Sequence, residues 1–334
     1  MDSALWAFGA LGYDYGMSVP SEILCCPATG SPLQQDAGGL RCDRRIYPVV
    51  NGVPVLVADE LSVFSVREVT ERRYVEAGVS RVRRIVGTVI PSPSLGIGGA
   101  DRYSRFARML RAHAGERRPR VLVIGGGRRD DEIAPLFESG AEIIGTDVYL
   151  SPHVDVVCDG HNLPFVNGCF DGVVIHAVLE HVLDPPRVVA EAHRVLAESG
   201  LVYSESPFLQ GVHEGAFDFT RWTDLGHRRL FRMFEEVDRG VVAGPATMLV
   251  WALCYFARSF PQRRASALAA KKLTTLMFFW VKYLDRYLVT RPGASDGASA
   301  TFFIGTRRAT AVPDAEILET YRGTIGRPVR HVAA

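Results

Sequence analysis

The chain has 334 residues, enough for about two domains of ordinary size, which excludes a lone small binding module. Lysine and arginine total 38 against 37 aspartate and glutamate residues, so the formal net charge of +1 provides no broad field that would attract nucleic acid or an anionic membrane. Apolar residues make up 47% and charged residues 22%, values that are typical of globular proteins and exclude a disordered or collagen-like chain.

The cysteines and the apolar segments predict a cytoplasmic protein. Six cysteines are scattered along the chain, apart from the adjacent Cys25 and Cys26, and do not form the dense framework of a small secreted protein. The first residues carry no Lys or Arg ahead of their apolar side chains and so lack the basic region of a signal peptide. The longest apolar runs, 248–257 and 276–281, are shorter than the roughly 20 residues of a membrane-spanning helix.

The N-terminal part differs from everything that follows it. Residues 20–58 are rich in Pro and Gly between short strand-like runs, and Asn51-Gly52 is typical of a tight hairpin turn. These features predict a small β module over 1–60. A helical segment and linker are expected over 61–99, because its last residues read PSPSLGIGG.

From Arg120 the pattern alternates strands with helices, which is typical of an α/β protein with an open parallel sheet. Strands are expected at 120–124, 142–147, 154–157, 171–176, 201–204, 235–242 and 301–305, and helices at 130–139 and 186–196. About 55 apolar, helix-compatible residues precede the last strand, too many for a simple connection. We therefore expect a helical insertion over 246–298 within a main domain of 100–310, and a tail over 311–334.

The first predicted strand ends in a run of glycines, Gly125 to Gly127, ahead of a helix. Glycines let the backbone approach a ligand closely, and a helix N-terminus favours negative charge. The second strand ends in Asp147, where a carboxylate can accept both ribose hydroxyls of a nucleotide cofactor. These features fit NAD and S-adenosylmethionine (SAM) equally, although the strict dinucleotide pattern would need glycine in place of Asp130.

The later motifs separate the two cofactors. In chain order they are DGHNLPF at 159–165, CFDGVV at 169–174, VLEHVLDP at 178–185, Glu191, RVL at 194–196 and Gly200. This series resembles the class I SAM-dependent methyltransferases that act on small molecules, over roughly residues 100–240. The resemblance implies SAM as the cofactor and a Rossmann-like sheet of seven strands.

Carried over position by position, the resemblance implies a SAM site. The glycine loop would lie under the methionine part, Asp147 would bind the ribose, and Asp159 would accept a hydrogen bond from the adenine amino group. The full set of implied cofactor-binding residues is Gly125, Gly126, Gly127, Asp147, Val148, Asp159, Gly160, His161 and His176. Two positions depart from the family, which usually has an acidic residue at Val123 and a further glycine at Arg129. A helix cap at Asp147 and a turn residue at Asp159 are the structural alternatives.

The N-terminal module resembles the small zinc-ribbon-like domains that partner translation-factor and tRNA methyltransferases. The residues that carry this resemblance are LCCP at 24–27, PL at 32–33, LRC at 40–42 and YPVVNGVPVL at 47–56. A zinc ribbon needs paired Cys-x-x-Cys knuckles around the metal. Here Cys26 is followed three positions on by Thr29, and Cys42 by Arg45. We therefore predict a metal-free platform and assign no metal ligands.

The segment after the fifth strand, 206–223, carries the candidate acceptor site. An alcohol acceptor needs its proton removed, most simply by a histidine with a pKa near 7. His213 is the first candidate for this general base and His181 the second, with Asp218 as an orienting neighbour and Arg221 and Trp222 as substrate-binding residues. The alternative is that Asp218 and Arg221 form a structural ion pair and that Trp222 belongs to the core.

The sequence thus predicts a SAM-dependent methyltransferase that methylates an oxygen of a small-molecule, sugar or lipid-linked acceptor, glycolipids included. Nucleic acid is excluded as a substrate, because the basic clusters are short and the Asn/Asp-Pro-Pro-aromatic motif of base-methylating enzymes is absent. The insertion is either a lid or an amphipathic surface over 246–290, and the second would make the protein peripheral to a membrane. The alternative functions are a non-catalytic SAM-fold scaffold and an NAD-dependent oxidoreductase.

Overall fold

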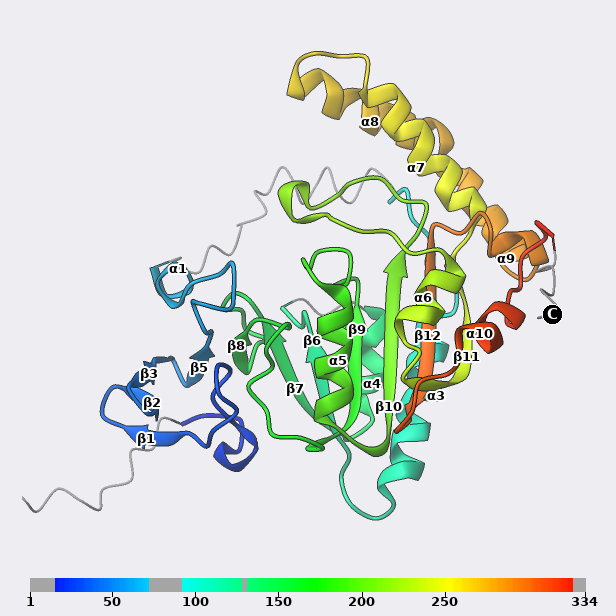
Figure 1. Ribbon diagram of the computed structural model, residues 1–334. Coiled ribbons are helices and arrows are strands. Elements are labelled where there is room, and N and C mark those ends of the chain that lie inside the picture. Colours follow the sequence, from blue (N-terminus) through cyan, green and yellow to red (C-terminus); the bar gives the residue numbers. More distant parts are fainter. Residues whose placement is uncertain (1–15, 72–91, 128–130, 327–334) are drawn as a thin grey trace, which may run out of the picture.

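The computed structural model describes residues 16–71, 92–127 and 131–326, and its centre is a nine-stranded sheet (Figure 1). The strand order is β11–β12–β10–β9–β6–β7–β8–β5–β4, with β12 antiparallel to both neighbours and β10, β9, β6, β7 and β8 mutually parallel. Seven of these strands are β6 (Arg120–Ile124), β7 (Glu142–Asp147), β8 (Val156–Cys158), β9 (Phe170–His176), β10 (Leu196–Pro207), β11 (Phe234–Ala243) and β12 (Ala300–Arg307). They are the seven predicted strands with their ends moved by a few residues, which confirms the α/β class.

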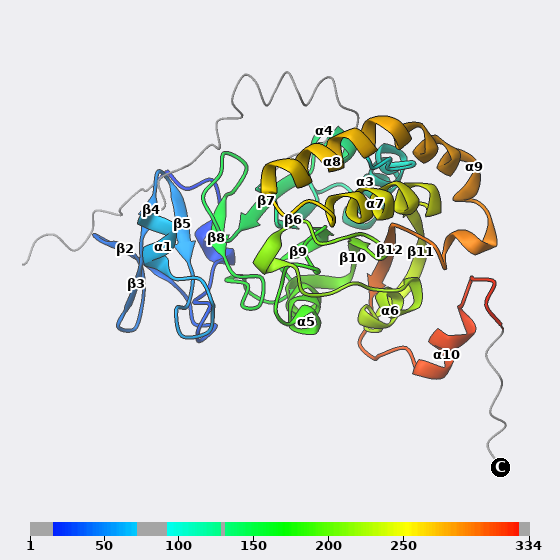
Figure 2. The same ribbon diagram turned by 90° about the horizontal axis from the view of Figure 1, so that it is seen from above.

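Helices cover both faces of this sheet (Figure 2). The helices of the main domain are α3 (Gly99–Ala114), α4 (Ala134–Glu138), α5 (Pro185–Val195) and α6 (Asp224–Leu230), with the short η2 (Asp131–Ile133) and η3 (Gly215–Phe217). Because side chains alternate along a strand, Val121 and Val123 of β6 join the core beneath α3, while Leu122 and Ile124 join the core beneath α5. Asp184 caps α5 by accepting a hydrogen bond from the backbone N–H of Arg187.

One departure from the family pattern finds its place in this core. Val123 is buried among the apolar side chains beneath α3, where the family usually has an acidic residue. The other departure, Arg129, lies outside the described residues, as does Asp130 at the start of the helix predicted over 130–139.

The N-terminal module contributes its last two strands to the central sheet. Strands β1 (Gln34–Asp36), β2 (Gly39–Cys42) and β3 (Arg45–Tyr47) form a small antiparallel sheet after η1 (Ser21–Ile23). The hairpin of β4 (Val49–Val50) and β5 (Val53–Leu56) turns at Asn51 and Gly52, whose φ angles of 53° and 79° confirm the predicted turn. Because β5 pairs in parallel with β8, one sheet crosses the boundary predicted near residue 60.

The residues at the four knuckle positions of the module have protein partners. The Sγ of Cys26 lies 3.3 Å from the hydroxyl of Tyr47, and the Oγ1 of Thr29 lies 3.5 Å from the Sγ of Cys42. Arg45 is paired instead with Glu60. Structural zinc sites use four sulfur or nitrogen ligands. At this place the described residues provide two thiols and two hydroxyls, a donor set that does not suit zinc.

The predicted helical insertion is confirmed. It consists of α7 (Pro245–Arg258), α8 (Arg264–Phe278), η4 (Phe279–Leu284) and α9 (Asp285–Leu288), followed by η5 (Pro292–Ala294). The buried carboxylate of Asp285 anchors it by accepting hydrogen bonds from the backbone N–H groups of Gly244, Ala246 and Thr247 at the start of α7. The α7–α8 hairpin extends beyond the carboxyl ends of the central strands (Figure 1).

Two further helices border the central fold. The helical segment predicted over 61–99 contains α1 (Val66–Glu71), and its continuation over 72–91 lies outside the described residues; α10 (Asp314–Glu319) lies in the predicted C-terminal tail. Within the ranges that the structure describes, every helix is too short or too polar to cross a bilayer.

The seam between the module and the main domain can be tested at Phe165. This fully buried ring packs edge-on against Phe170, and its backbone bridges to Leu24 of the module. We expect Phe165→Ala to lower the free energy of unfolding by about 3–5 kcal/mol in denaturant titrations, because it leaves a cavity in the shared core. The control Phe260→Ala, at a side chain that is 71% exposed, should change it by about 0.5 kcal/mol or less. Equal losses in both variants would contradict a shared core.

Candidate functional site

The glycine turn after β6 is held against the end of β7. Gly125 has a φ of 74°, and a Cβ there would lie 2.3 Å from the side chain of Val178. A Cβ on Gly127 would lie 2.6 Å from the carboxylate of Asp147. The backbone N–H groups of Gly127 and Val148 donate to that carboxylate over 3.0 and 2.7 Å. The turn therefore requires glycine at Gly125, and at Gly127 it brings the carboxylate close to the backbone, an arrangement that fits SAM.

The second predicted carboxylate, Asp159, is buried and already hydrogen-bonded. Its Oδ1 accepts from the backbone N–H of His161 (3.0 Å) and lies 2.6 Å from the Nδ1 of that ring, while the hydroxyl of Ser62 donates to Oδ2. Burial alone would raise the pKa of Asp159, but the hydrogen bonds from His161 and Ser62 outweigh it and lower the pKa. Ser62 follows the N-terminal module, so the segment after the module reaches the predicted adenine site.

The neighbours of Asp159 are fixed by the same contacts. The Nε2 of His161 accepts a hydrogen bond from the backbone N–H of Asp184 (3.0 Å), which holds the ring in place. A Cβ on Gly160 would meet only ordinary contacts with Val188 and Ile124, so packing does not require glycine there.

A cavity of about 280 Å³ opens at the carboxyl ends of β9 and β10. Its charged and titratable lining residues are Glu132, His176, Glu180, Glu205 and His213. The carboxyl ends of β6 and β9 flank the point where the strand order reverses, which is where open α/β sheets bind ligands. The cavity thus lies next to the glycine turn, where an acceptor can meet a cofactor.

A buried polar network forms one wall of this cavity. The guanidinium of Arg102 donates to the carboxylate of Glu205 (3.2 Å) and to the hydroxyl of Tyr203 (3.1 Å), and that hydroxyl donates to Glu205 in turn. Tyr103 lies 2.7 Å from the Nδ1 of His176, whose Nε2 lies 3.8 Å from Glu205. Glu205, Arg102 and Tyr103 were not predicted from the sequence as site residues. The available signal was an acidic residue directly after an apolar strand.

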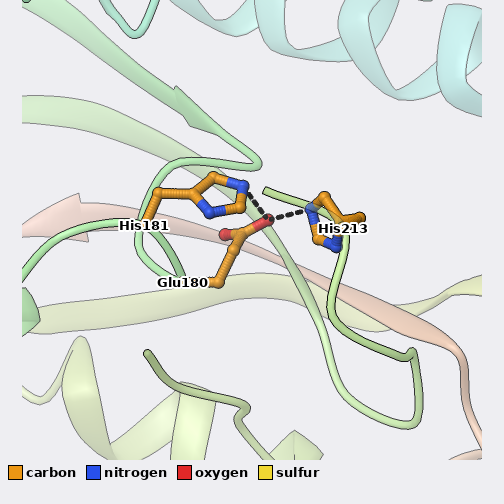
Figure 3. A group of neighbouring side chains, drawn as sticks. All are labelled: Glu180, His181 and His213. Carbon is orange, nitrogen blue, oxygen red and sulfur yellow. Dashed lines mark ion pairs between the residues drawn. The ribbon is translucent and has the colours of Figure 1, made fainter. Parts of the chain in front are cut away.

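A second polar cluster joins residues from two loops: Glu180 and His181, which follow β9, and His213, which follows β10 (Figure 3). The Oε1 of Glu180 lies 3.7 Å from the Nε2 of His181 and 3.9 Å from the Nε2 of His213. The two rings meet edge to face with centroids 4.8 Å apart. Burial raises the pKa of Glu180 to about 7 and lowers the pKa of His181. The fold therefore brings both candidate catalytic histidines together.

The remaining predicted acceptor residues clamp the loop that carries His213. Asp218 is ion-paired with Arg221 and accepts a hydrogen bond from the backbone N–H of His213 (2.8 Å). Burial would raise the pKa of Asp218, but Arg221 and the His213 N–H outweigh it and hold it well below its usual range. Arg221 also donates to the carbonyls of Gln210 and Gly211. The ion pair that was the structural alternative is therefore present.

Arg221 and Trp222 lie outside the group of residues that line the cavity. The indole N–H of Trp222 is buried and lacks a hydrogen-bond partner among the described residues. Their predicted contact with substrate stays a prediction.

Comparison with known proteins agrees with these features. Residues 124–204 match the model of a methyltransferase domain, and residues 21–52 match that of the Trm112p-like proteins. No curated protein matches.

Solved structures with a similar fold share little sequence with this chain. A Burkholderia thailandensis 1,6-didemethyltoxoflavin-N1-methyltransferase with bound S-adenosylhomocysteine is 18% identical, with 62% of this chain and 78% of that chain covered and a TM-score of 0.36. The [4+2]-cyclase SpnF is 17% identical over 62% and 82% of the two chains, with a TM-score of 0.37.

The two matched segments coincide with the regions whose motifs carried the two resemblances. The glycine turn and the Asp147 carboxylate lie in the first, and the altered knuckles lie in the second. Residues 124–204 are thus similar to a methyltransferase domain, and residues 21–52, ahead of them, are similar to the Trm112p-like proteins.

Proposed function

We propose that this protein is a SAM-dependent O-methyltransferase whose acceptor enters the cavity at the ends of β9 and β10. The observation that carries the proposal is the position of Glu180 and His213 on the wall of that cavity, beside the glycine turn. Methylation of a hydroxyl needs the acceptor oxygen aligned with the methyl group and its proton removed. Glu205, which lines the same cavity, is already engaged by Arg102 and Tyr203. This leaves the Glu180 cluster to act on the acceptor.

The proposed cofactor site uses the residues implied by the resemblance. The turn of Gly125, Gly126 and Gly127 would hold the methionine part, Asp147 and Val148 the ribose, and Asp159, Gly160 and His161 the adenine, with His176 between cofactor and cavity. Bound SAM supplies an electrophilic methyl group. The main task of the chain is to hold the acceptor oxygen in line with that group and to exclude water.

Replacing Asp147 tests the cofactor site. We expect Asp147→Ala to weaken SAM binding by about tenfold or more in calorimetry, because it removes the proposed ribose ligand and the acceptor for two backbone N–H groups. Asp238→Ala, at a residue on β11 that is paired with Arg105, is the matched control and should bind SAM normally. Unchanged affinity in Asp147→Ala would contradict the ribose assignment. A folded wild-type protein that binds no SAM would favour the scaffold alternative.

Replacing His213 tests the acceptor site. Purified protein is incubated with methyl-labelled SAM and an extract of polar lipids and small glycosides. We expect label on oxygen atoms of the extract, and about 10²-fold less of it with His213→Ala, because the activating cluster loses a member. SAM affinity should not change. The control is His193→Ala, because the Nε2 of His193 lies 2.7 Å from the carbonyl oxygen of Arg308, outside this loop. Label found only on nitrogen or carbon would refute O-methylation.

We further propose that the acceptor is lipid-linked and that the α7–α8 hairpin rests on an anionic membrane surface. Residues 245–284 contain no Asp or Glu. Their exposed or half-buried basic residues are Arg258, Arg263, Arg264, Lys271 and Lys272, whereas Lys282 is buried and donates to the carbonyls of Ser92 and Ser94. The exposed apolar side chains of this region are Leu249, Phe256, Phe260, Leu268, Leu273, Leu276, Met277, Trp280, Tyr283 and Leu284. Apolar side chains interleaved with uncompensated basic charge fit the interface of an anionic bilayer.

The inner side of the same hairpin borders the cavity. The indole N–H of Trp251 donates to the hydroxyl of Ser94 (2.8 Å), and Ser94 lines the cavity. The hydroxyl of Tyr255 donates to the carbonyl of Val212, next to His213. A membrane-bound hairpin would therefore bring the cavity mouth to the lipid surface, so the lid and the membrane surface predicted as alternatives are compatible.

Vesicle sedimentation tests the membrane proposal. The protein should bind vesicles that contain phosphatidylglycerol more strongly than vesicles of phosphatidylcholine alone, and less at high salt. The triple variant Phe256→Ser, Phe260→Ser, Trp280→Ser should bind vesicles at least tenfold more weakly. Serine at the exposed Leu318 and Ile325 is the control. Vesicle binding by the triple variant that equals wild type would contradict the proposal. A concentration-dependent dimer that the triple variant abolishes would also contradict it, because a second copy of the chain would then cover the apolar face.

A further inference from the structure

The Glu180 cluster has a spacing close to that of a metal site. A tetrahedral site with metal–ligand bonds of about 2.0–2.2 Å separates its ligand atoms by roughly 3.3–3.6 Å. The separations from the Oε1 of Glu180 to the two histidine Nε2 atoms are 3.7 and 3.9 Å. All three candidate ligand atoms lie within 4.8 Å of one another. The two distances from Oε1 are too long for direct hydrogen bonds and exceed the tetrahedral spacing by only a few tenths of an ångström.

Both histidines turn the same nitrogen toward the carboxylate. The Nδ1 of His181 lies 2.6 Å from the carbonyl oxygen of Phe217, so this nitrogen donates its proton there. The Nδ1 of His213 lies 3.3 Å from the carbonyl oxygen of Gly211 and 3.4 Å from the carboxylate of Asp218. Each Nε2 therefore presents its lone pair to Glu180. Metal-binding histidines usually donate their other ring N–H to a carboxylate or carbonyl oxygen, which fixes the orientation of the ring.

The carboxylate of Glu180 has no other described partner. Its side chain is 0% exposed, and neither Oε1 nor Oε2 receives a hydrogen bond from the described residues. Burying a carboxylate without a partner is costly, so an orphaned one calls for an explanation. Arg221, the nearby cation, is committed to Asp218 and to loop carbonyls. A positive charge at the point where both Nε2 lone pairs converge would satisfy the carboxylate.

We propose that Glu180, His181 and His213 bind one divalent first-row transition-metal ion. Two imidazoles and one carboxylate suit zinc, manganese, iron or cobalt better than magnesium or calcium. Since Glu180 and His213 also line the cavity, the ion keeps an open position toward it, as catalytic metal sites do. His213 is then a metal ligand rather than the general base predicted from the sequence, and Asp218 is a positioning residue behind it.

The catalytic part of this inference rests on the proposed function. An acceptor hydroxyl that takes the open position has its pKa lowered by the ion, as metal-bound water does, and releases its proton to solvent. The acceptor oxygen then uses a lone pair to form a bond to the methyl carbon of SAM. The bond between that carbon and the sulfonium sulfur breaks with its electron pair going to sulfur. The products are a methyl ether or ester and neutral S-adenosylhomocysteine.

Direct metal binding tests the inference without an acceptor. Tag-free full-length protein is stripped with a chelator, and titrated with zinc by calorimetry and with cobalt by visible absorption. We expect one ion per chain and ligand-field bands from cobalt. Glu180→Gln and His213→Asn should each weaken binding at least tenfold. Asp218→Asn should weaken metal binding about 10–100-fold, because Asp218 supports His213 from behind. If Asp218 served only to hold the loop in shape, metal affinity would not change.

The controls separate this site from the altered zinc knuckles. The double variant Cys26→Ser, Cys42→Ser should still bind the single ion, and so should His193→Asn. Loss of binding in the double serine variant, or full binding in Glu180→Gln and His213→Asn, would overturn the inference. Calorimetry with SAM shows whether each variant is folded. Metal binding without any methyl transfer would reject the proposed function but support the metal site. O-methylation by a metal-free protein would reject the catalytic role of the metal but support the proposed function.

Discussion

The reversal of strand order at β6 is the constraint on which the rest of this molecule depends. The chain runs outward from β6 through β7 to β8 and then returns to place β9 on the other side of β6. The carboxyl ends of β6, β7 and β9 therefore meet at one edge, with no connecting helix between β6 and β9 to fill the crevice. The glycine turn, Asp147 and His176 each lie at one of these ends. Parallel pairing, more than any single side chain, brings the proposed cofactor site together.

The Trm112p-like module contributes to the fold through its strands and its apolar core. Its strand β5 pairs with β8 and so covers what would otherwise be an exposed sheet edge. Cys26 and Cys42 now bond to the hydroxyls of Tyr47 and Thr29, and the module shares one apolar core with the main domain. Its stability thus comes from burial against the larger domain, which also places Ser62 on the carboxylate of Asp159.

The proposed acceptor region is organised by an ion pair and hydrogen bonds rather than by regular structure. The loop after β10 is held by Arg221, which binds Asp218 and two loop carbonyls, and Asp218 in turn holds the backbone of His213. The insertion adds a second support, because Tyr255 of α7 bonds to the carbonyl of Val212. A side chain on a loop needs such anchoring to keep a catalytic position. The result is an open polar site between a rigid sheet and a helical hairpin with an apolar outer face.

The sequence by itself determined the order of strands and helices, the glycine turn with its Asp147 and the loss of the zinc knuckles. Periodicity, turn residues and motif spacing are local properties, so they are legible without a structure. Only the tertiary structure decided that Glu180, His181 and His213 converge and that β5 joins the central sheet. It also decided that Arg102 reaches Glu205 across 103 positions of the chain and that Tyr103 reaches His176 across 73. Such contacts depend on loop paths and strand register, which no short pattern encodes. The burial of Glu180 is likewise a tertiary property. Only the packed structure shows that its carboxylate lacks a hydrogen-bond partner among the described residues.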